Sequence, residues 1–429
     1  MDERDSSRIE AFRQLKKEIR GSKEHLIVGI DIGKNKHHAF LGTAIGNKLR
    51  SIIVENNASG FEHLLTMVQF FSDRERLKKI VFGVEPTSVY HKPLSEFLIR
   101  NGFLVVYVTN EAIKKNRALL DGRWDKNDTK DAANVADLIG QGKCQYYDFP
   151  QMNLRDIRSL LLLRKRLIKQ AHSARIRIRN NLVAQYFPEL DKFWNKSEKE
   201  NLAIVRWCLS PHKINKMEFE NFYKMVAPKY RGETQYQRIS KIWEMSPYSI
   251  GCLAGLALDL EARILVEGLN RIQCDIIEVD RTIKVICSCF DEYKLLLTIP
   301  GFGPYISAVV LAAIGNPDRF QNMKEVIRLA GYDLNANRSG KKSNSAVPVI
   351  SKKGKVDLRY ALYQAALIAS SSNRYFRAYF HMLLQGRERE KGIRTKMRVK
   401  LATKLLVVAW TLMKKKESFD PQYIRLKTK

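Results

Sequence analysis

The alternation of apolar and polar positions predicts a mixed α/β region in the first third of the chain. Apolar residues at every second position indicate strands, and apolar residues three or four positions apart indicate helices. After His25 the expected order is three strands, helix, strand, helix, strand and helix. The strands are expected at Leu26–Ile32, Lys36–Ala44, Lys48–Glu55, Lys79–Val84 and Phe103–Val108, and the helices at Ser59–Phe71 (capped by Ser59), Lys92–Asn101 and Asp128–Gly140.

Four acidic residues occupy particular places in this pattern. Asp31 lies in the first strand, within the run VGIDIG, and Glu85 follows the fourth strand, within VEPT. Asp128 and Asp131 are three residues apart and therefore share one helix face. Carboxylates this close repel one another unless a cation lies between them. The four acids predict a site for two magnesium ions, a common device for breaking phosphodiester bonds.

The order of elements is that of the ribonuclease-H-like fold, to which RuvC-like domains belong. In that fold the carboxylates lie in the middle of the first strand, at the end of the fourth strand and on the last helix. Asp31, Glu85 and the Asp128/Asp131 pair fall at those places. We therefore expect a RuvC-like catalytic domain over residues 25–148, preceded by a charged lead-in at residues 1–24.

Beyond residue 149 the pattern becomes helical and basic. One long helix is expected from Leu154 to Asn181 and a second from Leu258 to Phe290. The two can pair as an antiparallel coiled-coil arm within residues 149–292. Between them, residues 185–250 are aromatic-rich and form an insertion whose structure the pattern does not predict. Residues 293–429 are expected to form a mostly helical C-terminal domain, with helices at Leu358–Ser370 and Lys400–Lys414.

Two segments of this last domain carry candidate chemistry. The run TIPGFGP resembles a helix-hairpin-helix, in which Gly301 and Gly303 let backbone N–H groups approach a phosphate. Farther along, Ser339 precedes a glycine and is surrounded by basic residues. A Ser-Gly pair is ordinarily a turn. The alternative is that Ser339 is a nucleophile, which attacks phosphorus and forms a covalent bond to DNA. On sequence spacing alone, Ser343 and Ser345 are alternative nucleophiles.

The charge balance favours nucleic acid as a partner. The formal net charge is +30, from 75 Lys and Arg against 45 Asp and Glu. Such an excess favours a polyanion. The candidate nucleic-acid contacts are Arg155, Arg158, Arg164, Lys165, Arg166, Arg175, Arg177, Arg179, Gly301, Gly303, Arg338, Lys341, Lys342, Lys352 and Lys353.

A membrane surface is the competing polyanion, but the sequence does not favour it. There is no clear amphipathic anchor, and no apolar run approaches the roughly 20 residues of a membrane span. The first residues are charged rather than apolar, which favours a cytoplasmic protein without a signal segment. The six cysteines are scattered, so we expect reduced, buried thiols rather than disulfides or a zinc site.

Other classes of protein share single motifs with this chain. The run VGIDIG also opens actin-like ATPases and sugar kinases, whose Asp-x-Gly loop holds phosphate and magnesium. Those enzymes need a second phosphate loop and an adenosine motif, and neither is found in the sequence. The run GIDIGK is also one residue short of a Walker A loop, which argues against a P-loop ATPase.

Taken together, the motifs resemble those of the DEDD-type insertion-sequence transposases of the IS110 type. This family is related to the Piv/MooV invertases and includes bridge-RNA-guided recombinases. The resemblance covers residues 25–145 and 290–420. The matching runs are GID ending at Asp31, EPT from Glu85, KNDTKDA from Lys126, IPGFG from Ile299, GNPDRF from Gly315, Ser339-Gly340, ISKKG from Ile350 and Leu358-Arg359.

The resemblance implies a mechanism and a set of partners. Asp31, Glu85, Asp128 and Asp131 are expected to be catalytic and to bind Mg²⁺, and Ser339 is expected to link covalently to a DNA 5′ phosphate. The arm is expected to support dimerisation and RNA binding, with dimers assembling into a tetramer that shares composite sites. A structured RNA is expected to pair with donor and target DNA.

The chain also departs from the family pattern. Ser88-Val89-Tyr90 replaces a frequent Gly-Gly-Tyr, Asn127 replaces a frequent Thr, and the insertion at 185–250 is large for the family. Two other functions remain open. A structure-selective nuclease using metal-activated water needs the four acids but no serine, and a non-catalytic nucleic-acid-binding protein needs the charge alone.

Overall fold

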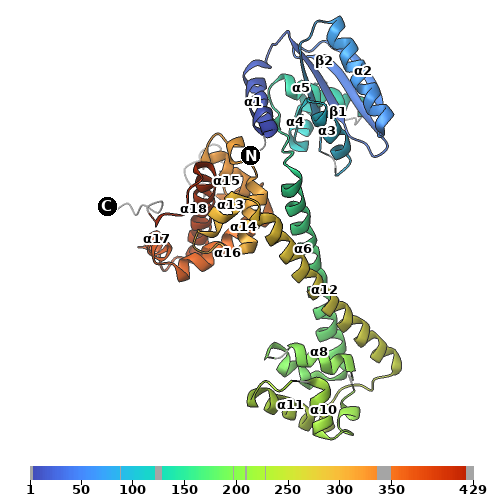
Figure 1. The fold of residues 1–429 in the computed structure, drawn as a ribbon, viewed down its shortest axis with the longest axis vertical. Helices are drawn as coiled ribbons and strands as arrows, with labels where there is room; N and C mark the ends of the chain where they lie inside the picture. The colour runs from blue at the N-terminus through green and yellow to red at the C-terminus, as the bar shows by residue number, and fades with distance from the viewer. Residues whose placement is uncertain are drawn as a thin grey trace. The chain divides into compact units, whose positions relative to one another are not determined.

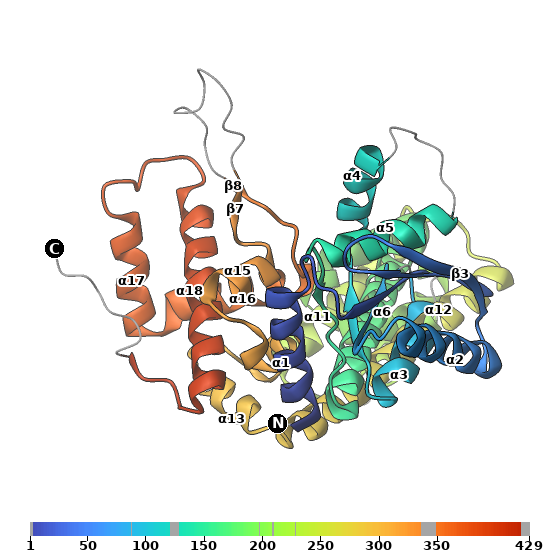
Figure 2. The same cartoon turned by 90° about the horizontal axis from the view of Figure 1, so that it is seen from above.

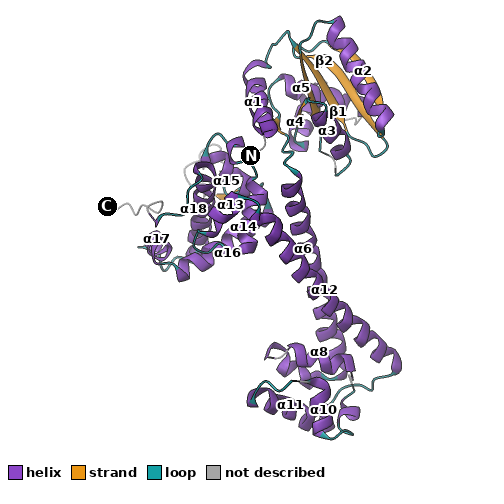
Figure 3. Ribbon diagram, viewed as in Figure 1, coloured by secondary structure: helices purple, strands orange, loops and turns teal. Residues whose placement is uncertain are grey.

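The chain folds into two compact units, residues 1–151 and residues 152–429. The structure, a computed structural model, describes residues 3–86, 88–120, 128–196, 198–207, 210–227, 229–335 and 349–421. The first unit is mixed α/β and is built on a six-stranded sheet. The second unit is mostly helical, with one short strand pair in its described residues (Figures 1 and 3).

The first unit contains most of the expected elements. The strands Lys48–Glu55 and Lys79–Val84 and the helix Asp128–Gly140 have the predicted bounds. The cap of the first expected helix is Asn57 rather than Ser59, because the extended Asn57 places its side-chain oxygen 2.8 Å from the Gly60 N–H. The elements are α1 (Glu3–Glu18), β1 (His25–Asp31), β2 (Lys36–Thr43), β3 (Lys48–Glu55), α2 (Ala58–Arg74), β4 (Lys79–Val84), α3 (His91–Arg100), β5 (Leu104–Tyr107), α4 (Asn110–Leu120), α5 (Asp128–Gly140) and β6 (Gln145–Tyr146).

The sheet places β1 at its centre, in the order β3-β2-β1-β4-β5-β6. Strand β1 pairs antiparallel with β2 and parallel with β4, and β4 pairs parallel with β5. Helices cover both faces (Figure 2). Val28 and Ile30 of β1 share a buried cluster with Leu64 of α2, whereas Ile27 shares another with Val135 of α5. The alternation along β1 therefore directs one set of side chains to each helical layer.

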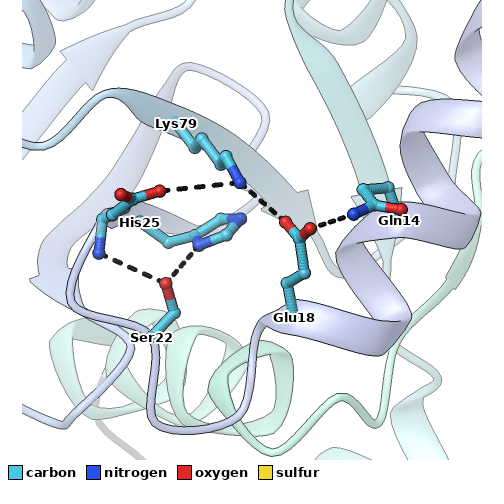
Figure 4. A network of polar contacts seen from close by, with 6 residues as sticks. Gln14, Glu18, Ser22, His25 and Lys79 are labelled. Carbon is cyan, nitrogen blue, oxygen red and sulfur yellow. Dashed lines mark hydrogen bonds and ion pairs between the residues drawn. The ribbon is translucent and has the colours of Figure 1, made fainter.

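The charged segment expected as a lead-in belongs to this core. It forms α1, and Leu15 of this helix and Ile19 just after it are buried in the cluster that contains residues of α5. Polar contacts also join the end of α1 to the sheet (Figure 4): Lys79 pairs with Glu18 at 2.7 Å, and Ser22 contacts the His25 ring at 2.6 Å. Burial, and then the nearby Lys79 charge, lower the pKa of His25.

Helix α4 is absent from the sequence prediction because it offers little apolar periodicity. Ile113 is its buried apolar residue among those with described side chains. Polar groups fix it to α5 instead: Asn116 donates to Asn134 at 2.8 Å, and Asn134 donates to the Ile113 carbonyl at 2.9 Å. Asn116 and Asn134 are both buried, so these hydrogen bonds satisfy groups that water does not reach.

The second unit begins with a helix that pairs with a distant one. Helix α6 lies antiparallel to α12, as the ion pairs Arg164–Asp280 and Arg177–Glu261 show (Figure 1). The expected continuous α-helix to Asn181 ends at Ile176, and a wider π-helical segment, η1, follows. The elements here are α6 (Met152–Ile176), η1 (Arg177–Val183), α7 (Ala184–Tyr186), η2 (Pro188–Lys196), α8 (Glu198–Trp207), α9 (Pro211–Ile214), α10 (Phe219–Val226), α11 (Glu233–Met245), η3 (Ser246–Tyr248) and α12 (Leu256–Ser288).

The aromatic-rich insertion is a small helical layer with its own core. Phe187 and Phe222 are fully buried, and Trp194 is nearly so. They share a cluster with Ala171 of α6 and Val266 of α12. The unusual aromatic content therefore supplies a core against one part of the helix pair.

The last part of the chain packs around a buried helix, α14. Its residues Ile306–Ile314 are all buried, within the cluster formed with α16 and α18. The two helices predicted here are present and longer, and α15 and α17 are additional. The elements are α13 (Asp291–Leu297), α14 (Pro304–Ile314), η4 (Pro317–Arg319), α15 (Met323–Ala330), β7 (Leu334–Asn335), β8 (Val349–Ile350), α16 (Val356–Ser372), α17 (Arg374–Leu384) and α18 (Ile393–Lys415).

The cysteines correct one expectation. The five described cysteines are free thiols, but only Cys144 and Cys287 among them are buried. Cys252, Cys274 and Cys289 are exposed, so the prediction of buried thiols is wrong for them. Cys208 lies outside the described residues. In the described part of the chain, no helix is both long and apolar enough to span a bilayer.

Candidate functional site

Two of the predicted acids end neighbouring strands at the same edge of the sheet. Asp31 is the last residue of β1, and Glu85 follows the last residue of β4. The strands are parallel with Ile30 beside Val84, and the Glu85 N–H donates to the Ile30 carbonyl at 3.4 Å. Asp31 and Glu85 are therefore neighbours on one face of the sheet. Each is half-buried.

Helix α5 lies directly over this face because two strand positions are glycine. A Cβ atom on Gly29 would lie 2.3 Å from the Ala132 carbonyl oxygen. A Cβ atom on Gly83 would lie 2.0 Å from Ile139. Gly29 and Gly83 precede Asp31 and Glu85 by two residues, so they share the face of those acids. The glycines thus mark the face on which α5 and the two acids meet.

The direction of α5 brings its first turn towards the acids. Ala132 of α5 lies beside Gly29. Gly140, at the other end of the helix, lies nearer the start of β1, since a Cβ atom on Gly140 would be 3.6 Å from the Ile27 side chain. The helix therefore runs from the carboxyl end of β1 towards its start, and Asp128 and Asp131 precede the contact at Gly29. The side chain of Asp128 lies outside what the structure describes.

Asp131 is held by an arginine that the sequence pattern did not single out. Its carboxylate Oδ1 accepts a hydrogen bond from Nη2 of Arg117, on α4, at 2.6 Å. The Asp131 side chain is 3% exposed and the Arg117 side chain 26%. A buried carboxylate needs such a cation or a metal ion, because its charge is costly to remove from water. Arg117 was missed because it lies on the unpredicted helix α4.

The donor chemistry of the acids fits magnesium, since carboxylate oxygens are the ligands it prefers. Among the side chains that the structure describes, no three acids, histidines or cysteines are gathered closely enough to hold a metal ion. The backbone nevertheless brings β1, β4 and the start of α5 to one place, and Asp131 is engaged by Arg117. Asp31, Glu85, Asp128 and Asp131 are the residues that would hold the ions.

Ser339 lies outside the described residues, as do Arg338, Lys341 and Lys342. The strands that precede and follow these residues, β7 and β8, pair antiparallel with Leu334 beside Ile350. The two ends of the segment 336–348, to which Ser339 belongs, therefore lie beside each other. Lys352 and Lys353, two predicted phosphate contacts, are exposed just after β8.

The two glycines of the predicted helix-hairpin-helix have different environments. Gly301 has a φ of +89°, and a Cβ there would lie 2.5 Å from the Ala365 carbonyl oxygen of α16. Its side-chain position is thus filled by helix packing rather than left free for a phosphate. Gly303 caps α14, and a Cβ there would meet nothing within 4 Å. Of the two, Gly303 has the open surroundings that a phosphate contact needs.

Several predicted basic contacts are engaged by groups of the same chain. Arg164 donates to both carboxylate oxygens of Asp280, at 2.5 and 3.2 Å, and lies 4.2 Å from the centre of the Tyr305 ring. The other partners are Asp357 for Lys165 (2.7 Å), Glu261 for Arg177 (3.5 Å), Asp191 for Arg179 (2.5 Å) and the Ala312 carbonyl for Arg158 (2.8 Å). These contacts stabilise the helical unit itself.

The remaining predicted arm residues differ in exposure. Arg155 and Arg175 are half-buried and each has a contact of its own. Arg166 is exposed and makes no polar contact with the described residues, and neither does Lys169 one turn later. Of the basic residues of α6, Arg166 and Lys169 are therefore the best placed to contact a phosphate backbone.

We expect an Arg166→Ala/Lys169→Ala variant to bind nucleic acid more weakly and with a shallower salt dependence. Each lost phosphate contact lowers the slope of log K against log salt by about 0.7 to 0.9. Arg164→Ala serves as the matched control: it should lower the free energy of unfolding by about 1–2 kcal/mol and keep the slope. Salt titrations of binding to duplex DNA and RNA, with thermal unfolding, check both. An unchanged slope in the double variant would contradict the assignment.

Comparison with known proteins identifies relatives of this chain. Residues 28–188 match the family model of the DEDD transposases of the IS110 type. Residues 293–381 match the family model of the IS116/IS110/IS902 transposases. The chain is 23% identical to the IS116 uncharacterized 44.8 kDa protein of Streptomyces clavuligerus, covering 93% of this chain and 97% of that protein.

Two further relatives point the same way. The IS110 uncharacterized 43.6 kDa protein of Streptomyces coelicolor is 22% identical, covering 91% of this chain and 94% of that protein. The pilin gene-inverting protein of Moraxella bovis is 28% identical over 34% of this chain and 45% of that protein. The chain therefore belongs to the IS116/IS110/IS902 transposase family, and as a transposase it is an enzyme that cuts DNA and transfers its strands.

Proposed function

We propose that residues 25–148 form a RuvC-like catalytic domain in which Asp31, Glu85, Asp128 and Asp131 hold two Mg²⁺ ions at a scissile phosphate. The observation that carries this proposal is the close approach of α5 to β1 at Gly29, which brings the start of α5 towards the acids that end β1 and β4. The strand order, with β1 central and antiparallel only to β2, supports the fold. Bound Mg²⁺ would polarise the phosphate and neutralise its developing charge.

Within this proposal Ser339 is the nucleophile. Its oxygen attacks phosphorus, so an Oγ–P bond forms and the P–O3′ bond breaks, which leaves a free 3′ hydroxyl and a 5′ phosphate on the protein. The 3′ hydroxyl of a second strand then displaces the serine and restores a phosphodiester. No external energy source is needed, because the covalent intermediate retains the bond energy. The IS116/IS110/IS902 match over residues 293–381 spans the segment that carries Ser339 and supports this assignment.

The partners follow from the same proposal. Donor and target DNA are the substrates, and a structured bridge RNA selects them. We place the C-terminal transposase domain at residues 293–429 and the coiled-coil arm at 149–292, where the exposed Arg166 and Lys169 would contact phosphates. A dimer that assembles into a tetramer would supply composite sites.

Such a protein would work in the cytoplasm of a bacterial or archaeal cell. The likeness to a protein named for gene inversion supports site-specific recombination.

The serine is tested by its adduct with DNA. We expect Ser339→Ala to bind nucleic acid normally and to form no covalent protein–DNA band on a denaturing gel, because the attacking oxygen is absent. Ser343→Ala and Ser345→Ala are matched controls close by in the sequence and should keep the band. A band that persists in Ser339→Ala would refute the nucleophile. Cleavage with no band in any variant would favour a nuclease that uses water.

The RNA is tested separately. The chain should be expressed with its native flanking DNA, purified, and the RNA that accompanies it sequenced. One discrete RNA encoded next to the gene would support guided recombination. A mixture of unrelated host RNAs would contradict it, since it would show that the basic surface binds without selection.

A further inference from the structure

We propose that Arg117 is a positioning residue that competes with the metal ion for Asp131. Its guanidinium neutralises the carboxylate, and metal loading requires Asp131 to exchange this partner for the ion. The inference rests on the proposed magnesium site. It assigns Arg117 a role in controlling how that site fills.

The geometry of the pair carries the argument. Nη2 of Arg117 lies 2.6 Å from Oδ1 of Asp131, whose side chain is 3% exposed. Water does not reach a carboxylate this deeply buried, so a neighbouring cation has to offset its charge. Among the described residues, Arg117 is the cation paired with Asp131. An arriving divalent ion would meet a carboxylate already bound to one positive charge. Two cations at one carboxylate repel each other, so filling the site by metal favours release of the arginine.

The arginine itself is poorly satisfied in this arrangement. Its Nε is buried and has no hydrogen-bond partner among the described residues. A guanidinium that serves a structural pair commonly binds a carboxylate through two parallel hydrogen bonds, as Arg164 does with Asp280. Arg117 makes one such bond to Asp131. A buried donor left unpaired costs free energy, so this pairing is less favourable than a fully satisfied one and easier to exchange for a metal ion.

The helix that carries Arg117 is fixed by other contacts. Asn116 donates to Asn134 at 2.8 Å and to Asp137 at 2.6 Å, both on α5. Ile113 is buried against the same helix and accepts a hydrogen bond from Asn134. Helix α4 therefore has anchors that do not depend on Arg117. A substitution of Arg117 should alter the charge at Asp131 while α4 stays in place.

The test is calorimetric titration of the full chain with Mn²⁺, without nucleic acid. We expect Arg117→Gln to lower the Kd for Mn²⁺ about tenfold, a coupling of ordinary size between two ligands of one site. Lys115→Gln is the matched control, because it removes one positive charge from the same helix. Lys115 forms an exposed pair with Glu111 at 3.1 Å. The Kd of Lys115→Gln should stay within about twofold of wild type.

Each outcome has a defined meaning. An unchanged or higher Kd in Arg117→Gln would overturn the competition, since a purely structural arginine gives that result. Equal tightening in both variants would also overturn it, because only the net charge would matter. Asp31→Asn separates the proposals: if wild type binds Mn²⁺ without depending on Asp31, the proposed metal site fails as well. Should Arg117→Gln not fold, as judged by circular dichroism, Arg117→Lys replaces it, with an expected Kd decrease of about threefold.

Discussion

An Asp31→Asn variant is expected to keep its fold and to lose DNA strand cleavage by at least about a thousandfold, or roughly 4 kcal/mol of transition-state stabilisation. Asparagine has nearly the same shape as aspartate but no charge, so β1 keeps its length and pairing. The amide would hold a divalent cation far less well than a carboxylate does. Cleavage of DNA carrying the native ends, measured over time with Mg²⁺ present, checks the prediction.

Asp73→Asn provides the control for that experiment. Asp73 lies on α2, on the opposite face of the sheet, and is exposed, with a hydrogen bond from Gln69 at 2.9 Å. The Asp73 substitution removes the same charge without approaching the site, so cleavage should be unaffected. Comparable loss in both variants would mean that general charge, and not the end of β1, determines activity. Full activity in Asp31→Asn would remove Asp31 from the metal site.

Gly29→Ala is the second substitution with a large expected effect. The added Cβ would lie 2.3 Å from the Ala132 carbonyl oxygen and 2.6 Å from the Ala136 amide nitrogen. Both are backbone atoms of α5, so the clash is relieved only if the helix moves as a body. We expect a loss of about 3 kcal/mol in the free energy of unfolding, at the upper end for overpacking. Chemical denaturation monitored by circular dichroism measures it.

The same displacement should affect catalysis, because Asp128 and Asp131 move with α5. Folded Gly29→Ala protein should therefore cleave DNA far more slowly than wild type. Gly140→Ala tests the opposite end of the helix, where the nearest atom to an added Cβ is the Ala44 oxygen at 3.4 Å. Its stability should change by less than about 1 kcal/mol. Equal losses at the two positions would contradict the idea that α5 is held to β1 at Gly29.

The α/β unit was largely predictable because its signals are local. Strands such as Lys79–Val84 are short apolar runs bounded by polar residues, and α5 has regular apolar spacing. Helix α4 and its Arg117 were not predictable, since α4 is fixed to α5 by Ile113 together with buried asparagines rather than by a regular apolar face. The importance of Gly29 also depends on a tertiary contact. A glycine in a strand signals close approach in general, but not the partner.

The basic arm shows a different limit of the sequence. A run of arginines predicts a polyanion-binding helix, yet the acids that neutralise them are far away in the chain. Asp280 lies 116 residues after Arg164, and Asp357 lies 192 residues after Lys165. Only the folded unit distinguishes these paired residues from the exposed Arg166. Charge in the sequence therefore overestimates the number of groups available to nucleic acid.

The most direct test of the proposed chemistry is to identify the residue that becomes attached to DNA. Wild-type protein would be reacted with DNA carrying the native element ends in Mg²⁺, digested with protease and nuclease, and its peptides examined by mass spectrometry. We predict a nucleotide 5′ phosphate on Ser339 and no such adduct in Asp31→Asn. Cleaved DNA with free 5′ phosphates and no modified peptide, or a nucleotide on a residue other than Ser339, would contradict it.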